Sequence, residues 1–329
     1  MRILANCLLG GLLAAALAAG AQAQQFKPAI IFDMGGKFDK SFNEAAFNGA
    51  ERFKKETGIA YREAEITNAA QREQVLTRLA GRGEADIVVA VGFSFASVLE
   101  KVAPRFPQTR FTLIDSVVDA PNVQSIVFKE HEGSFLVGMA AAMASKTGKV
   151  GFVGGMDIPL IRKFQLGYTE GAKFVNPAAE VFANMTGTTP AAWADPAKGA
   201  ELARSQFDRG ADVVYAAAGS TGLGVLQAAK DLGKLSIGVD SNQNHLHPGS
   251  VLTSMIKRVD VAVYDAFKAA QANSWKGGVK VLGLAEDGVG WSLDEHNAKL
   301  ITPEMKAKIE QAKADIIAGK IKVTDYMAK

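Results

Sequence analysis

The middle of this sequence contains the same unit twice, and this repeat limits the fold more than any other feature. The first copy runs from Asp86-Ile87-Val88-Val89-Ala90-Val91-Gly92, through a helical stretch, to Phe111-Thr112-Leu113-Ile114-Asp115-Ser116. The second copy runs from Asp212-Val213-Val214-Tyr215-Ala216-Ala217-Ala218-Gly219 to Ser236-Ile237-Gly238-Val239-Asp240-Ser241. Each copy therefore reads as a buried strand, a turn, a helix and a second buried strand that ends in Asp-Ser.

The apolar runs of both copies lack alternation, which is typical of parallel strands covered by helices on both faces. In open α/β sheets, ligands bind beyond the carboxyl ends of such strands. Two sheets that face each other would place Gly92, Asp115, Gly219 and Asp240 around one cleft. We therefore expect an α/β chain with two Rossmann-like lobes and a small-molecule site between them.

Residues 1–23 are typical of a secretory signal peptide. A basic residue precedes an almost wholly apolar run, residues 3–19, and Ala21-Gln22-Ala23 fits the cleavage pattern. A transmembrane anchor is the alternative, but the run is short and no stop-transfer charges follow it. A lipid-anchored start would place its cysteine after the apolar run, whereas Cys7 comes near its beginning. We expect cleavage after Ala23 and an exported protein without an anchor.

Composition argues against several classes of protein. Outside the leader the chain has no cysteine, so we expect neither a disulfide framework nor thiol chemistry. The net charge is +3 with basic and acidic residues interleaved, so nothing indicates nucleic acid binding. No later segment approaches about 18 uninterrupted apolar residues, the length of a membrane span. The length of 329 residues suits two domains, and we expect a monomer.

Strand-like and helical runs alternate along the whole chain, and the pattern restarts near residue 149. This alternation predicts two parallel sheets with right-handed crossovers. We expect the N-terminal lobe to hold residues 24–129 and 258–284, and the C-terminal lobe to hold residues 130–257 and 285–329. Three strands then form a hinge, and such a hinge permits closure around a ligand.

The residues that open the first predicted helix are candidates for ligand contact. Ser41 is predicted as the N-cap of this helix, with Glu44 completing a capping box. We expect Phe42 to stack on a planar ligand while Asp39 or Asn43 bonds the edge of that ligand. The alternative is an ordinary capping loop with Phe42 in the core.

Trp193 is the candidate aromatic of the second half. It lies among small residues in the loop 187–195, ahead of a predicted helix, which is an unusual place for an indole. We expect it to face Phe42 across the cleft. The alternative is a tryptophan that packs against its own loop.

Three charged residues complete the predicted site. Asp115 and Asp240 end corresponding strands, where a short acid accepts from ligand hydroxyls or ring N–H groups. As N-caps of the following turns, both acids would need no ligand. Lys257 follows the predicted strand Val251–Ile256 and is expected to pair with Asp240 and with a ligand oxygen. The alternative for Lys257 is a place on the hinge surface.

Other motifs argue against cofactors and catalysis. The run Gly219-Ser220-Thr221-Gly222-Leu223-Gly224 lacks the Gly-Lys-Ser/Thr ending of a P-loop, so it indicates close backbone approach to an uncharged ligand. His245-Leu246-His247 has no evident third metal ligand. Neither a Ser-His-Asp order nor paired carboxylates stand out. We expect no cofactor, no metal and no enzymatic activity.

Six motifs spread over the chain form a specific combination. They are Asp39-Lys40-Ser41-Phe42-Asn43, Glu130-His131-Glu132-Gly133-Ser134-Phe135-Leu136-Val137-Gly138, Gly154-Gly155-Met156-Asp157-Ile158-Pro159, Ala218-Gly219-Ser220-Thr221-Gly222, Gly238-Val239-Asp240 and Thr253-Ser254-Met255-Ile256-Lys257. Through these motifs the chain resembles the basic membrane protein family of solute-binding proteins, whose best-known members bind purine nucleosides. The resemblance covers essentially all of the chain after the leader.

The resemblance implies a periplasmic-binding-protein type I fold and delivery of the ligand to the membrane permease of an ABC importer. It also implies that Phe42 and an aromatic of the second lobe sandwich the base. Family members commonly have Phe at the second position, and Trp193 takes that place here. Members are often lipoproteins, whereas the leader of this chain indicates a soluble protein of the periplasm.

By the same analogy, Asn43 and Asp115 bond the edge of the base, while Asp240 and Lys257 engage the ribose near Gly219. The expected ligand is a purine nucleoside. A free purine base, or a sugar or small signalling molecule, is the alternative within the same class. A nucleoside-processing enzyme would need a metal or a general base in the cleft. A ligand-sensing regulator would need a DNA-binding segment, which is not evident.

Overall fold

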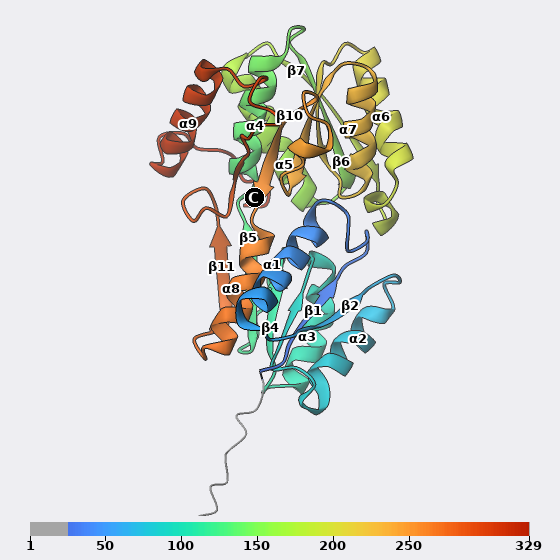
Figure 1. Cartoon of the computed structure of the whole chain (residues 1–329), viewed down its shortest axis with the longest axis vertical. Helices are drawn as coiled ribbons and strands as arrows, with labels where there is room; N and C mark the ends of the chain where they lie inside the picture. Colours follow the sequence, from blue (N-terminus) through green and yellow to red (C-terminus); the bar gives the residue numbers. More distant parts are fainter. Residues whose placement is uncertain (1–25, 329) are drawn as a thin grey trace, which may run out of the picture.

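The computed structural model describes residues 26–328, and the predicted leader with its cleavage site lies outside the described residues. The described chain forms two α/β lobes stacked along the long axis of the molecule (Figure 1). Each lobe is built on one six-stranded sheet, and all pairs in these sheets except one are parallel. The predicted fold class of two α/β lobes with parallel sheets is confirmed.

The first sheet has the strand order β11-β5-β4-β3-β1-β2. Its strands are β1 (Pro28–Phe32), β2 (Arg62–Glu65), β3 (Ile87–Ala90), β4 (Arg110–Ile114), β5 (Val123–Phe128) and β11 (Gly278–Leu282). The second sheet has the order β12-β10-β9-β8-β6-β7. Its strands are β6 (Lys149–Met156), β7 (Glu180–Gly187), β8 (Val213–Ala217), β9 (Leu235–Asp240), β10 (Val251–Lys257) and β12 (Val289–Trp291). The central strands of both sheets are fully buried, as their unbroken apolar runs predict.

Helices cover both sheets. They are α1 (Phe42–Thr57), α2 (Gln71–Ala80), α3 (Ala96–Val102), α4 (Glu130–Ala144), α5 (Pro159–Val175), α6 (Pro196–Asp208), α7 (Thr221–Asp231), α8 (Val259–Gln271) and α9 (Pro303–Ile317). Helix α8 packs against α1 on the first lobe, and α4 packs against α5 on the second (Figure 1). Among the described residues, no helix is both long and apolar enough to cross a membrane.

The chain crosses between the sheets three times: from β5 to α4, from β10 to α8 and from β11 to β12. Backbone bonds tie these crossings together, because Lys129 N–H donates to the Leu282 carbonyl and Arg258 N–H donates to the Gly288 carbonyl. The exact lobe boundaries given above stay a prediction.

The glycine-rich stretch 277–290 forms strands that its sequence pattern does not indicate. It contains β11 and β12, both at sheet edges. Four of the five residues of β11 are exposed, and β12 has only three residues. Short edge strands with little burial carry almost no hydrophobic pattern, so sequence reasoning missed them.

Candidate functional site

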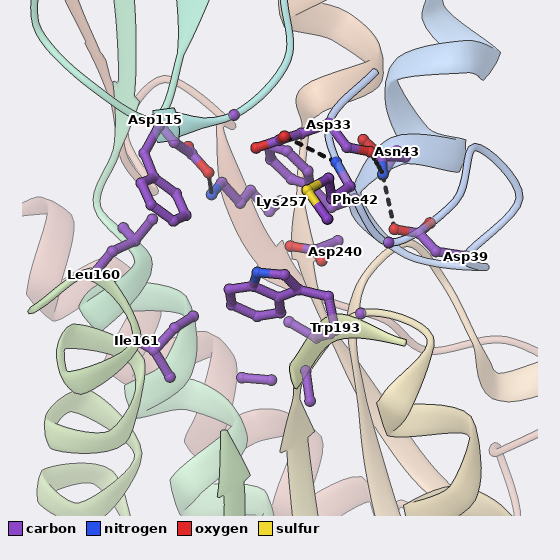
Figure 2. Close-up of a pocket in the computed structure, with 18 of the residues that line it drawn as sticks. Asp33, Asp39, Phe42, Asn43, Asp115, Leu160, Ile161, Trp193, Asp240 and Lys257 are labelled. Carbon is purple, nitrogen blue, oxygen red and sulfur yellow. Dashed lines mark hydrogen bonds and ion pairs between the residues drawn. The ribbon is translucent and has the colours of Figure 1, made fainter. Parts of the chain in front are cut away.

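A cavity lies between the lobes, at the carboxyl ends of both sheets. The empty space in it, including the open solvent at its mouth, is about 620 Å³. Its lining residues are Asp33, Met34, Gly35, Asp39, Phe42, Asn43, Gly92, Phe93, Asp115, Leu160, Ile161, Phe164, Trp193, Ala217, Ala218, Gly219, Val239, Asp240 and Lys257. All nine residues predicted for the site therefore line one cavity. Figure 2 shows ten of the lining residues with labels.

Phe42 and Trp193 line the cavity from opposite lobes, as predicted (Figure 2). Phe42 is the first residue of α1, and Trp193 ends the short 3-10 helix Pro190–Trp193. The hydroxyl of Ser220 donates to the Trp193 carbonyl over 2.7 Å and fixes the backbone there. The indole lies against the backbone of Gly155, where any side chain would overlap the ring. The absence of a side chain at Gly155 of β6 therefore lets the indole ring of Trp193 lie directly against that strand.

Gly92 and Gly219 follow β3 and β8 at equivalent places in the two lobes. Both have positive φ, +114° and +57°, which favours glycine. A Cβ atom on Gly92 would come within 3.0 Å of Asp33 Oδ2, and one on Gly219 within 3.3 Å of the Trp193 carbonyl. The lack of a side chain therefore lets Asp33 approach Gly92 closely, and lets the backbone of Trp193 approach Gly219 closely.

The start of α1 differs from the predicted capping box. The side chain of Ser41 makes no capping hydrogen bond. Instead Asp39 Oδ1 accepts from Ser41 N–H and Glu44 N–H, and Asp39 Oδ2 accepts from Asn43 N–H. Asp39 is therefore the capping residue, and burial raises its pKa to about 7. A local pattern cannot separate two neighbouring capping residues, since both have suitable side chains.

Asn43 is almost fully buried, and its amide is held in one orientation. Its Nδ2 donates to the carbonyls of Asp33 and Gly36, both over 3.1 Å. Its Oδ1 is buried without a partner in the described structure. One unpaired acceptor atom therefore belongs to a residue that lines the cavity.

Asp115 and Asp240 lie at the ends of β4 and β9, and both adopt the left-handed backbone, with φ of 71° and 63°. This conformation is costly for most residues but is tolerated by aspartate. Asp240 Oδ2 accepts from the hydroxyl of Ser41 over 2.5 Å. Asp115 Oδ2 accepts from Lys257, and Asp115 Oδ1 is buried without a partner. Burial raises the pKa of Asp115 to about 6 and raises that of Asp240.

Lys257 is the last residue of β10, and its partners differ from the prediction. Its Nζ lies 2.7 Å from Asp115 Oδ2 and 3.0 Å from Glu130 Oε1, and it forms no direct pair with Asp240. Burial alone would lower the pKa of Lys257, but the carboxylates of Asp115 and Glu130 outweigh it and raise that pKa. Lys257 is therefore a charged, fully buried cation and does not lie on the hinge surface. Its partner Glu130 was not among the predicted site residues.

Asp33 was also missed by the sequence reasoning. It follows β1 directly, and its Oδ1 accepts from Arg72 Nη2 over 2.6 Å. Its place immediately after an apolar strand is the signal that identified Asp115, so the same rule would have found it. Leu160, Ile161 and Phe164 of α5 add an apolar wall that carries no motif of its own.

The histidines lie apart from the cavity. His245 is in the 3-10 helix Asn244–Leu246, and its ring centroid is 6.4 Å from that of His296. Asp294, Glu295 and His296 have their ligand atoms within 4.8 Å of one another, but this cluster includes neither His245 nor His247. Both oxygens of Asp294 already accept hydrogen bonds, from Asn242, Asn244 and the backbone of His296.

Comparison with known proteins agrees with this geometry. An uncharacterized lipoprotein of Pyrococcus abyssi is 38% identical over 308 residues, which cover 89% of this chain and 74% of that protein. The ABC transporter nucleoside-binding protein BmpA of Lactococcus lactis is 35% identical over 322 residues, covering 90% of this chain and 88% of that protein. A solved structure of an ABC transporter solute-binding protein from Aeropyrum pernix superposes with a TM-score of 0.83 at 33% identity, covering 90% and 92% of the two chains.

The likeness to the Aeropyrum pernix protein confirms the expected periplasmic-binding-protein type I fold. The family described as PnrA-like ABC transporter substrate-binding proteins matches residues 26–326. Its members are substrate-binding proteins of ABC transport systems. The chain therefore belongs to the basic membrane protein family of ABC transporter substrate-binding proteins.

Proposed function

We propose that this chain captures a purine nucleoside in the periplasm and delivers it to the permease of an ABC importer. The observation that carries the proposal is the pair of aromatic side chains, Phe42 and Trp193, that lines one cavity from opposite lobes. Base stacking on an aromatic side chain contributes about 1–3 kcal/mol per base. The Lactococcus lactis relative is named as a nucleoside-binding protein, which supports the same ligand class.

The polar atoms of the wall favour a ligand with N–H or O–H donors at its edges. Asn43 Oδ1 and Asp115 Oδ1 are buried acceptors without partners. A buried acceptor left unpaired costs about 1–3 kcal/mol, so a bound donor would recover that energy. Purines carry such donors on their edge, and ribose carries them on its hydroxyls. We assign the base to Asn43 and Asp115, and the ribose to Asp240 and Lys257 near Gly219.

The charges of the wall favour a ligand without phosphate. Four acidic residues, Asp33, Asp39, Asp115 and Asp240, are among those that line the cavity. Lys257 is the cation among the lining residues, and two carboxylates already hold it. A phosphate would be repelled by the acids and would find no free cation among the lining residues. We therefore place nucleosides, and not nucleotides, in the cavity.

The proposal includes export with cleavage after Ala23 and function as a monomer. Sequencing of the mature N-terminus from the native host is expected to begin at Gln24, because residues 21–23 fit the cleavage rule. A lipidated cysteine, or an intact Met1, would contradict this. Light scattering of the purified protein is expected to give the mass of one chain.

The decisive experiment identifies the ligand directly. Protein purified without denaturation is analysed by mass spectrometry for retained small molecules, and the emptied protein is then titrated calorimetrically. The titrants are adenosine, guanosine, inosine, their free bases, adenosine monophosphate, ribose and glucose. We expect nucleosides to bind with micromolar or better affinity and the monophosphate to bind far more weakly. Tight binding of a sugar alone, or of the monophosphate, would overturn the proposal.

A further inference from the structure

The first residue of α4 is an acid that the cavity does not use directly. Glu130 opens the segment Glu130-His131-Glu132, and only 1% of its side chain is exposed. Its two oxygens form separate ion pairs, Oε1 with Lys257 at 3.0 Å and Oε2 with Lys163 of α5 at 3.1 Å. Burying a carboxylate is costly unless it is paired, so this position calls for an explanation.

The pairs of Glu130 belong to a chain of alternating charges. Asp115 on the cavity wall pairs with Lys257, which pairs with Glu130, which pairs with Lys163. Lys163 also donates to the Phe128 carbonyl over 2.7 Å, so its ammonium group is anchored to the end of β5. Lys257 and Glu130, the two inner members of this series of ion pairs, thus each have an oppositely charged side chain on both sides.

We infer that Glu130 is a positioning residue that holds the ammonium group of Lys257 beside Asp115, with Lys163 fixing Glu130 from the other side. Lysine has a long flexible side chain, and one carboxylate alone would leave its end free to turn about that contact. Two carboxylates restrain it from two sides. An ammonium group has three donors and Asp115 accepts from one of them, so donor capacity remains for a ligand oxygen.

The surroundings of Lys257 leave little room for another position. Its Nζ lies 5.1 Å from the ring centroid of Phe42, 5.0 Å from that of Phe128 and 5.6 Å from that of Phe164. Glu130 follows the crossing from β5, and Lys257 precedes the crossing from β10. The pair therefore joins two of the three crossings at the cavity wall. Only the contact of Lys257 with a ligand rests on the proposed function.

The test compares Glu130→Gln with Glu132→Gln. Glu132 is in the same first turn, but it pairs with Lys129 at 3.2 Å and accepts from Leu284 N–H, away from Lys257. Both changes remove one negative charge from the same helix terminus, so the control matches the effect on the helix and on net charge. Circular dichroism and thermal melting establish that each variant is folded.

The first readout is the nitrogen NMR spectrum of lysine ammonium groups in the ligand-free protein. Ammonium protons that are buried and hydrogen-bonded exchange slowly, so Lys257 is expected to give a sharp signal, assigned by its loss in Lys257→Met. Glu130→Gln is expected to broaden or shift this signal, and Glu132→Gln to leave it unchanged. An unchanged Lys257 signal in folded Glu130→Gln would overturn the inference.

The second readout is ligand affinity. Glu130→Gln is expected to weaken nucleoside binding roughly tenfold to a hundredfold, the loss for a hydrogen bond to a charged group, and to affect the free base less. Adding Lys257→Met to Glu130→Gln is expected to cause little further loss. A disturbed signal with unchanged affinity would support the positioning role and refute the ligand contact of Lys257 in the proposed function.

If Glu130→Gln does not fold, the double variant Glu130→Gln with Lys163→Met replaces it. The double variant removes one charge of each sign, so Lys163 is not left buried with the more distant Asp325, at 3.5 Å, as its remaining acid. The same change of the Lys257 signal is expected. An unchanged signal in the folded double variant would again overturn the inference.

Discussion

The hydroxyl of Ser41, at the start of α1 in the first lobe, donates a 2.5 Å hydrogen bond to Oδ2 of Asp240, at the end of β9 in the second lobe. Two more bonds cross at the same place. Ser241 Oγ donates to the Ser41 carbonyl over 2.9 Å, and Gln243 Nε2 donates to the Lys40 carbonyl over 2.9 Å. These three hydrogen bonds hold the two lobes together beside the cavity, in a closed arrangement. We call this set of three bonds the latch.

Removing the latch hydroxyl is expected to shift the ligand-free protein toward an open form. In Ser41→Ala the closed form loses a hydrogen bond to a charged group, which is worth about 1.5–3 kcal/mol. That loss corresponds to a change of roughly tenfold to a hundredfold in the ratio of closed to open protein. Small-angle X-ray scattering is expected to show a larger radius of gyration than for wild type.

The control for the latch is Ser274→Ala, since the hydroxyl of Ser274 bonds only within the first lobe, to the Ala269 carbonyl. It should scatter like wild type. Identical scattering curves for Ser41→Ala and wild type would show that the hydroxyl does not hold the lobes together.

The contribution of Asp39 to the stability of the ligand-free protein should fall as the pH rises from about 4 to 7. Burial raises the pKa of Asp39 from 3.8 to about 7. Between those values the native state binds a proton that the unfolded state does not bind, so the free energy of unfolding decreases with pH. The slope reaches about 1.4 kcal/mol per pH unit for each such proton. Asp115, with a pKa of about 6, acts in the same direction.

Urea unfolding at several pH values measures this slope. Asp39→Asn should flatten it, because the side chain no longer titrates. Asp195→Asn is the matched control, since Asp195 caps α6 by accepting from Lys198 N–H but is exposed. A slope that Asp39→Asn leaves intact would mean that other groups cause it.

Loss of either stacking ring should weaken purine binding. Phe42→Ala and Trp193→Ala are each expected to cost about 1–3 kcal/mol, the range for base stacking on one aromatic side chain. Phe38→Ala is the control, because Phe38 is on the same loop but is 60% exposed and does not line the cavity. Calorimetry that finds wild-type affinity in both cavity variants would refute the sandwich.

The contact that positions the indole ring of Trp193 can be tested without changing the tryptophan. A methyl group at position 155 would overlap the indole ring, so Gly155→Ala should displace the ring, shift its fluorescence and weaken binding. Gly290→Ala is the control, because a Cβ atom there meets nothing within 4 Å. Unaltered fluorescence and affinity in Gly155→Ala would show that the ring is not held by this contact.

The features that sequence reasoning predicted depend on short-range patterns. The apolar strands of the repeat, and the acids that end them, follow each other along the chain, so Asp115 and Asp240 could be placed at one cleft from strand order alone. The same rule applied to Asp33 would have added it to the site. Phe42 was found because it opens a helix just after a strand.

The features that sequence reasoning missed depend on tertiary contacts. The two carboxylates that hold Lys257 come from β4 and α4, 142 and 127 positions earlier in the chain. Two candidate acids, Asp115 and Asp240, lie at similar strand ends, and spacing cannot decide which one the lysine reaches. Burial of Glu130 likewise follows from the packing of α4 against β10, and a helix N-terminus with two acids normally indicates an exposed first turn.

The last prediction separates a nucleoside from a free base. Asp240→Ala is expected to cost about 1.5–3 kcal/mol for nucleosides, because the carboxylate would no longer accept from the ribose hydroxyls. It should cost much less for the matching base. Asp240 also accepts from Ser41, so part of any loss reflects the latch, and that part is common to both ligands.

Ser41→Ala, measured with the same ligand pair, gives the size of the common part. The difference between nucleoside and base in Asp240→Ala, after this correction, reports the ribose contact alone. An equal loss for both ligands, with a wild type that prefers the base, would mean that the cavity is a nucleobase site and that Asp240 faces the ring edge. We favour the nucleoside because Asp240 and Lys257 line the cavity, and the ribose of a nucleoside offers them hydroxyl partners that a bare base lacks.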